Sequence, residues 1–439
     1  METTVTEGSG PSLKEQVRRR LLEERDPEFV GSSTAEKRVK LREAIMRVID
    51  EERFIVSGVA VASLVREITD EVLGLGPLEE LLRDSRVTEV MINNPDNIYV
   101  EVDGRIERSA IRLNSEEQIH HLIERVIGPL GLRVDESQPY VEARLPDGSR
   151  LHAIIPPLSI HGPAVTIRKF SATPFTYETL LAQETLTEQM AAFLDSAVRA
   201  KMNIIISGGT GSGKTTLLNV LSASIPESER LITIEEAAEL RLAREHVLAL
   251  ESRPANIEGS GEVTVRQLVR NALRMRPDRI IVGECRSGEA LDMLQAMNTG
   301  HEGSLSTCHA NSPEDLLVRL ETMVMMAELG LAPGPVRQQI AAALDLVIHT
   351  TRFQDGSRKI VKVSEVGGLV EDGLRLKDVF TFRPSGVSAE GLVLGEFEVG
   401  ERPECLERMA SSGIDISPLE ALFEQRKSRV PALPLKESR

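Results

Sequence analysis

The sequence predicts an α/β protein with more than one domain, and three observations support this prediction. A length of 439 residues is enough for about three domains of ordinary size. Between residues 204 and 348, short apolar runs of strand length alternate with helical segments, which is typical of a parallel sheet covered by helices. Between residues 78 and 170, strands are joined by tight turns, which indicates a separate α+β domain.

Composition narrows the class of protein further. Hydrophobic residues make up 41% and charged residues 27%, and the formal net charge is −16, so the chain is a poor general binder of nucleic acid. No apolar run approaches the roughly 18 to 20 residues of a membrane helix, and the polar N-terminus lacks the apolar segment of a signal peptide. The three cysteines include no C-x-x-C pair, which fits a reducing compartment. We therefore expect a cytoplasmic protein with no integral membrane segment and no nucleic-acid partner.

The chain divides by pattern into six regions. Residues 1–35 are polar and predict a disordered tail, whereas 36–77 carry one-sided apolar stripes, such as Leu41, Ile45 and Val48, and predict a helical unit. The α+β domain follows over 78–170 and a linker over 171–180. The main α/β domain covers 181–355, and a C-terminal extension of short strands and Gly-rich turns covers 356–439.

Local signals place the elements within the two folded domains. In the α+β domain, Ser115 followed by Gln118 marks a helix start, and strands are expected at 87–92, 98–102, 141–145, 150–155 and 165–168. In the main domain, the apolar runs predict strands at 204–207, 231–234, 280–282, 304–307 and 346–348.

A phosphate-binding motif follows the first of these main-domain strands. The sequence matches the pattern G-x-x-x-x-G-K-[ST] with Gly208, Gly209, Thr210, Gly211, Ser212, Gly213, Lys214 and Thr215. Thr216 follows directly and is a further candidate for nucleotide binding. Glycines let successive backbone N–H groups face phosphate oxygens, and the helix that follows adds its positive N-terminus. We expect ATP as ligand, with Lys214 at the β- and γ-phosphates and Thr215 on Mg²⁺. The alternative is a chance Gly-rich turn.

Carboxylates end two further strands. Glu284 follows the apolar run that begins at Arg279, and Glu235 and Glu236 follow residues 231–234. Because parallel strands end at one sheet edge, these side chains should lie near the phosphate-binding motif. Glu284 would orient the attacking water or hold the metal. Glu235 is either part of the site or an acidic helix start, and which of Glu235 and Glu284 is the general base stays open.

Two histidines flank the strand at 304–307. His309, at its end, could hydrogen-bond a γ-phosphate, whereas His301 precedes it. Their spacing disfavours metal ligation. Structural histidines bonded to the backbone are the alternative.

The order of these four blocks resembles the secretion ATPase superfamily of type II secretion, type IV secretion and type IV pili. Four more segments resemble the CpaF-type ATPases that assemble Tad/Flp pili: GLGPLEELL, VTEVMINN, LPDGSRLHAIIPP and TIRKF, at 74–82, 87–94, 145–157 and 166–170. The resemblance covers roughly residues 40–425. It implies a PAS-like N-terminal domain and a RecA-like P-loop ATPase domain in a homo-hexameric ring.

The same resemblance implies roles for individual residues. Glu235 matches the acidic-box glutamate and Glu284 the Walker B glutamate, and His301 and His309 match the histidine box. Arginines that reach nucleotide across a domain or subunit junction match Arg144, Arg150 and Arg168, which sequence alone would place on the surface. The acidic box departs from the family's Glu-Asp pattern, since Glu236 stands second.

The implied function is an ATP-driven motor for Tad/Flp pilus assembly. It would act through an inner-membrane platform protein, held peripherally on the inner face of the cytoplasmic membrane. A type IV or type II secretion ATPase that moves protein or DNA substrates is the alternative. A nucleotide-binding scaffold without hydrolysis is disfavoured, because Lys214, Thr215 and Glu284 are all present.

Overall fold

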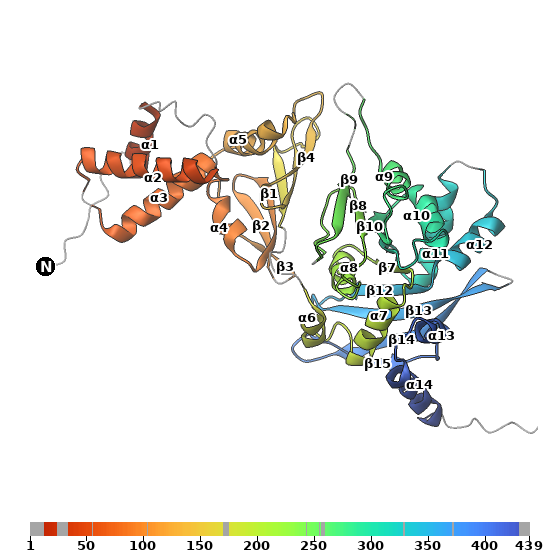
Figure 1. The fold of residues 1–439 in the computed structure, drawn as a ribbon. Helices are drawn as coiled ribbons and strands as arrows, with labels where there is room; N and C mark the ends of the chain where they lie inside the picture. The colour runs from red at the N-terminus through yellow and green to blue at the C-terminus, as the bar shows by residue number, and fades with distance from the viewer. Residues whose placement is uncertain are drawn as a thin grey trace, which may run out of the picture. The chain divides into compact units, whose positions relative to one another are not determined.

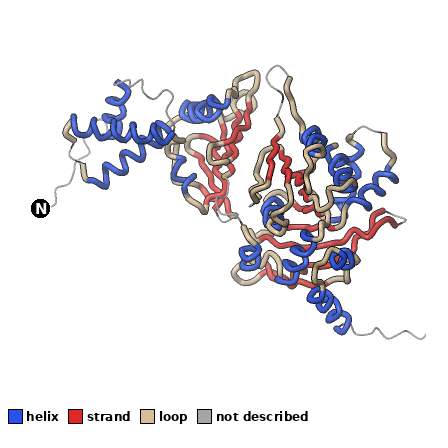
Figure 2. The backbone as a smooth tube through the Cα atoms, in the orientation of Figure 1, coloured by secondary structure: helices blue, strands red, loops and turns tan. Residues whose placement is uncertain are grey.

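The computed structural model describes residues 13–23, 34–54, 56–102, 104–169, 175–242, 244–253, 255, 260–327, 330–370 and 373–429. Contacts between α-carbons divide the chain into two compact units, Met1–Ser171 and Ala172–Arg439. Both units contain helices and strands (Figure 1), and each unit contains its own sheet (Figure 2). The predicted α/β class is confirmed. No helix within the described ranges is both long and apolar enough to cross a membrane.

Three helices begin the first unit: α1 (Leu13–Glu23), α2 (Thr34–Glu51) and α3 (Gly58–Leu73). They share a small core in which Val17, Ile45 and Ile68 are fully buried. The tail predicted over 1–35 is therefore wrong for α1, because Val17 gives this polar helix an apolar contact with α2 and α3, and for residues 34–35, which begin α2. The rest of that prediction, at 1–12 and 24–33, lies outside the described residues.

A six-stranded antiparallel sheet forms the rest of the first unit, in the order β3-β2-β1-β6-β5-β4. Helix α5 packs on this sheet through apolar residues that include Ile119 and Ile123. Ser115 caps the helix as predicted, accepting a hydrogen bond from the Gln118 N–H at 3.4 Å. The elements are α4 (Leu78–Arg83), β1 (Val87–Asn94), β2 (Asn97–Val102), β3 (Arg105–Arg108), α5 (Glu116–Ile127), the 3₁₀ turn η2 (Gly128–Leu130), β4 (Tyr140–Arg144), β5 (Arg150–Ile154) and β6 (Ala164–Arg168).

The second unit is built on a nine-stranded sheet in the order β15-β14-β13-β12-β7-β11-β10-β8-β9. Strands β12, β7, β11, β10, β8 and β9 pair in parallel, and β13, β14 and β15 continue the sheet in antiparallel fashion. The strands are β7 (Ile204–Gly208), β8 (Leu231–Glu235), β9 (Val247–Glu251), β10 (Arg279–Cys285), β11 (Leu305–His309), β12 (Leu346–Arg352), β13 (Arg358–Val370), β14 (Gly373–Val387) and β15 (Val393–Val399).

Two parts of the second unit differ from the prediction. Residues 356–439 contain long strands that belong to the main sheet, because β13 pairs with β12 along its length. The linker predicted over 171–180 contains the start of α6 (Tyr177–Ala182), and its residues 171–174 lie outside the described ranges. Strand β9, at the sheet edge, was not predicted.

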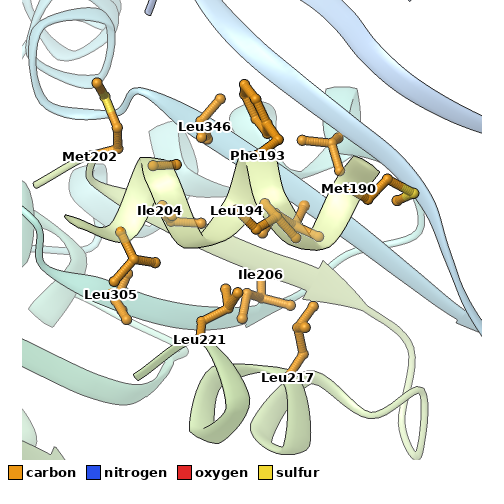
Figure 3. Packing of buried hydrophobic residues seen from close by; sticks show 14 of the residues in the cluster. Met190, Phe193, Leu194, Met202, Ile204, Ile206, Leu217, Leu221, Leu305 and Leu346 are labelled. Atoms are coloured by element: carbon orange, nitrogen blue, oxygen red, sulfur yellow. The ribbon is translucent and has the colours of Figure 1, made fainter. Parts of the chain in front are cut away.

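Helices cover both faces of this sheet. Ile204 and Ile206 of β7 join a core with α7 (Glu188–Arg199), α8 (Lys214–Ser222), α13 (Cys405–Ser411) and α14 (Ser417–Arg429). Ile205 points to the opposite core, formed with α9 (Val265–Ala272), α10 (Glu289–Asn298), α11 (Pro313–Met325) and α12 (Pro333–Ala343). Figure 3 shows α7 and α8 packed on β7 through Phe193, Leu194, Ile204, Ile206, Leu217 and Leu221. The buried strand β7 thus carries its last residue, Gly208, to a fixed place at the sheet edge.

Candidate functional site

The glycine-rich loop (residues 208–213) joins β7 to α8 in the strand–loop–helix order that the motif requires. Gly211 and Gly213 have φ values of 71° and 94°, a left-handed conformation that glycine adopts without steric cost. Lys214 begins α8, and its Nζ donates hydrogen bonds to the carbonyls of Gly208 at 3.1 Å and Gly209 at 2.9 Å. The ammonium group is therefore held inside the curve of the loop, where it can attract phosphate.

Strand β12 supports the loop from one side. His349 Nδ1 and Ser207 Oγ lie 2.8 Å apart, and Thr350 Oγ1 lies 3.0 Å from Ser212 Oγ. Burial lowers the pKa of His349, so its ring is neutral near pH 7. These supports come from residues about 140 positions further along the chain. No sequence signal within the motif points to them.

Glu284 and His309 meet at the mouth of the loop. Strands β7, β11 and β10 are neighbours, so their ends bring together Thr210, His309 and Glu284. His309 Nε2 lies 3.3 Å from Thr210 Oγ1, and its Nδ1 contacts Glu284 Oε1. Glu284 Oε2 also accepts a hydrogen bond from Arg286 Nη2 at 2.7 Å. Burial opposes ionisation of Glu284, but Arg286 and His309 outweigh it and lower its pKa, so the carboxylate is charged.

Glu235 ends β8 and Glu236 follows it, and the two side chains have different surroundings. Glu235 is 4% exposed, and its Oε1 accepts hydrogen bonds from the N–H groups of Glu239 at 2.8 Å and Leu240 at 3.0 Å. Within the described residues, its Oε2 is buried without a partner. Burial raises the pKa of Glu235 to about 7. Glu236 is half exposed and receives a hydrogen bond from Arg286. Arg286, which the sequence did not single out, thus joins the carboxylates of Glu236 and Glu284.

His301 does not join this group. Strand β11 runs parallel to β7, with Leu305 opposite Ile204 and His309 opposite Gly208. His301 precedes the strand and lies at the other sheet edge, because five strand residues span more than 10 Å. Its N–H donates to the carbonyl of Ala296 at 3.3 Å. The structure therefore brings only one of the two expected histidines to the loop.

The three expected arginines lie in the first unit and occupy one row across its sheet. Arg144 of β4 is opposite Arg150 of β5, and Arg150 is opposite Arg168 of β6. On the far side of Arg168 stands Glu89 of β1, a partly buried carboxyl whose pKa is raised by burial. Arg150 Nη2 also lies 3.7 Å from Glu142 Oε2, so acidic side chains accompany the three arginines on this sheet.

The residues at the loop fit a magnesium–nucleotide ligand. Thr215 and Thr216 lie in the first turn of α8 and are partly buried. The described residues contain no group of three or more His, Cys, Asp and Glu side chains that could hold a metal ion. Mg²⁺ does not require such a group, because substrate phosphates and water supply most of its ligands. The Lys214 ammonium, bonded to two loop carbonyls, carries the positive charge that phosphates need. Within the described residues, Glu235 Oε2 is a buried polar atom without a partner.

Comparisons with known proteins identify the family of the chain. The family model described as "Type II/IV secretion system protein" matches residues 71–385. A putative conjugal transfer protein of Mycobacterium tuberculosis is 38% identical over 306 residues, covering 68% of this chain and 86% of the relative. Type IV secretion system protein VirB11 of Brucella suis is 35% identical over 320 residues, covering 66% of this chain and 88% of the relative.

One solved structure is also similar to part of the chain. The crystal structure of the VirB11 ATPase from the Brucella suis type IV secretion system has 31% sequence identity and a TM-score of 0.37, covering 66% of this chain and 95% of that chain. The family match spans well over half of the sequence. The chain is a member of the type II/IV secretion system protein family.

Proposed function

We propose that this protein is a RecA-like P-loop ATPase motor that hydrolyses ATP with Mg²⁺. The observation that carries the proposal is the continuous set of contacts from Thr210 in the glycine-rich loop through His309 to Glu284. A loop that binds phosphate, placed near an ionised carboxylate two strands away in the same sheet, is an arrangement that nucleotide hydrolysis needs.

The side chains divide the chemistry among them. ATP supplies the phosphoryl group, and Mg²⁺, held by Thr215 and Glu284, would neutralise its charge. Lys214 binds the phosphates from inside the loop. Glu284, charged and fixed by two partners, orients water or the ion at the loop mouth. Glu235, with a pKa of about 7, is matched to accept a proton near neutral pH.

The proposed assembly is a homo-hexameric ring with a PAS-like domain preceding each ATPase domain. In this ring the row Arg144, Arg150 and Arg168 reaches nucleotide across a domain or subunit junction. Three arginines in register support the idea, because together they match a polyphosphate better than one surface arginine does.

Two cellular processes fit such a motor. The first is Tad/Flp-type pilus assembly through an inner-membrane platform protein, on the inner face of the cytoplasmic membrane. The second is type IV or type II secretion of protein or DNA, favoured by relatives named for conjugal transfer and type IV secretion. Deleting the gene and scoring pili and substrate transfer in the same strain distinguishes them.

ATP hydrolysis is tested with two variants of the full chain. Lys214→Ala should weaken nucleotide binding, because it removes the charge inside the loop. Glu284→Gln should keep binding and lower turnover by about 10² to 10⁴, because it removes a charge at the reacting group. Turnover is measured with and without Mg²⁺, and affinity separately with ADP. Equal losses of affinity in both variants would contradict the role of Glu284, and a wild-type chain without turnover would contradict the motor.

A further inference from the structure

The hairpin between β12 and β13 lies directly against the glycine-rich loop, within the second unit. Arg352, the last residue of β12, is opposite Arg358, the first of β13. Arg358 Nε donates a hydrogen bond to the carbonyl of Gly211 at 2.9 Å. Arg352 packs on the same residue, since a Cβ added to Gly211 would lie 3.2 Å from Arg352 Nη1. Two arginine side chains therefore form the outer wall of the loop.

This hairpin is itself firmly held. Asp355 at its turn accepts hydrogen bonds from the N–H of Ser357 at 2.9 Å and from the N–H of Val393 at 2.7 Å. The residues that follow Arg358 are tied to the segment before α7. Lys359 Nζ donates to the carbonyl of Glu184 at 2.8 Å. Arg358 consequently reaches the loop from a fixed base rather than from a mobile surface segment.

The bond to Gly211 controls where the next N–H points. In a trans peptide the carbonyl of Gly211 and the N–H of Ser212 face opposite ways. A donor that holds the carbonyl from outside turns the Ser212 N–H toward the inside of the loop. That N–H does face inward, with a long contact of 3.4 Å to the Gly209 carbonyl. The Gly209 carbonyl also receives the Lys214 ammonium.

We propose that Arg358 is a positioning residue that keeps the glycine-rich loop in its phosphate-binding shape and thereby sets the affinity for nucleotide. The inference rests on the proposed function, since it concerns the same loop. Arg358 acts through the Gly211 carbonyl and does not need to touch the phosphate. Loss of the bond should therefore weaken binding, whereas the groups at the loop mouth, and with them the chemical step, stay in place.

Two variants separate positioning from simple charge attraction. Arg358→Gln carries an amide nitrogen at the same bond distance from the backbone as Arg358 Nε, so it keeps the donor and loses the charge. Arg358→Met has a similar shape and no donor. Arg383→Met is the matched control, because Arg383 is an exposed strand arginine of the same sheet, ion-paired with Glu398.

The measurements are the Kd for ADP and the KM and kcat for ATP, on the full chain with Mg²⁺. Arg358→Met should raise Kd and KM about three- to tenfold with kcat within about twofold, as expected for one exposed hydrogen bond. Arg358→Gln should stay within about twofold of wild type, and Arg383→Met should match wild type. Thermal unfolding of all variants checks that the fold is intact.

Two results would overturn the proposal. Unchanged affinity in Arg358→Met would show that the bond does not shape the loop. Equal weakening in Arg358→Gln and Arg358→Met would show that the charge acts on the phosphates directly. ADP affinity does not depend on turnover, so a chain that binds nucleotide but never hydrolyses it would contradict the motor and leave the Arg358 comparison valid.

Discussion

The buried carboxyl of Glu235 makes the stability of the protein depend on pH in a predictable direction. Burial raises its pKa from the usual 4.5 to about 7. The folded chain therefore holds this proton more tightly than the unfolded chain does. Below about pH 4.5 Glu235 is protonated in both states, and its contribution to stability is complete. This contribution falls as the pH rises toward 7 and stays low above pH 7. A pKa change of this size corresponds to about 3 kcal/mol of unfolding free energy.

Glu235→Gln removes the titration while keeping an oxygen for the N–H groups of Glu239 and Leu240. We expect the variant to lose the decline in stability that wild type shows between about pH 4.5 and pH 7. Urea unfolding at a series of pH values, followed by circular dichroism, gives this difference. The absolute stability of the variant is less informative, because the new amide nitrogen would be buried where Glu235 Oε2 lacks a partner.

The neighbouring carboxylate supplies the control. Glu236 is 53% exposed at its side chain and is paired with Arg286, so Glu236→Gln should keep the pH dependence of wild type. If wild type and Glu235→Gln instead show parallel pH dependence across this range, Glu235 is ionised in the folded chain and the reasoning from its burial is refuted.

Two further predictions concern the two histidines and the row of arginines. His309→Ala should lower ATP turnover by about 10² with little change in nucleotide affinity, because Glu284 loses its link to Thr210 and a misplaced catalytic group costs about this much. His301→Ala, at the other sheet edge, should lower turnover far less. Equal losses of turnover in steady-state assays of the two variants would contradict their separate positions. Arg168→Ala should lower turnover by about 10³ or more if the arginine row contacts the γ-phosphate, and mixing it with Lys214→Ala should restore part of the activity if that contact is made between subunits. A mixture no more active than the separate variants argues against a contact in trans.

The local parts of the fold and site were predictable because their signals lie within a few residues. The strand, glycine-rich loop and helix around Lys214 form as expected, since a buried apolar run, positive-φ glycines and a helix start are contiguous. Edge strand β9 was missed because it is only partly buried: Val247 and Leu250 pack against the cores, whereas Leu248 is exposed. Helix α1 was missed because its polar sequence depends on α2 and α3 for burial of Val17.

Contacts that depend on strand order and register could not be predicted from local sequence patterns. Glu284 could be placed at the sheet edge, but its bond to His309 and the bridge from Arg286 to Glu236 require the order of β7, β11, β10 and β8. His301 is absent from the loop, although it is close to His309 in sequence, because it precedes β11 and His309 ends that strand. Register also places Arg358 opposite Arg352, which no motif indicates.

The support of the glycine-rich loop by β12 has a consequence for synthesis of the protein. Ser207 and Ser212 bond to His349 and Thr350, which are 142 and 138 residues downstream, and β7 is flanked on one side by β12. A ribosome that adds about 5 to 20 residues per second needs roughly 7 to 28 s to pass from one partner to the other. During this interval the nascent chain has the motif but not the strand that buttresses it, so nucleotide cannot be held firmly until synthesis has passed β12.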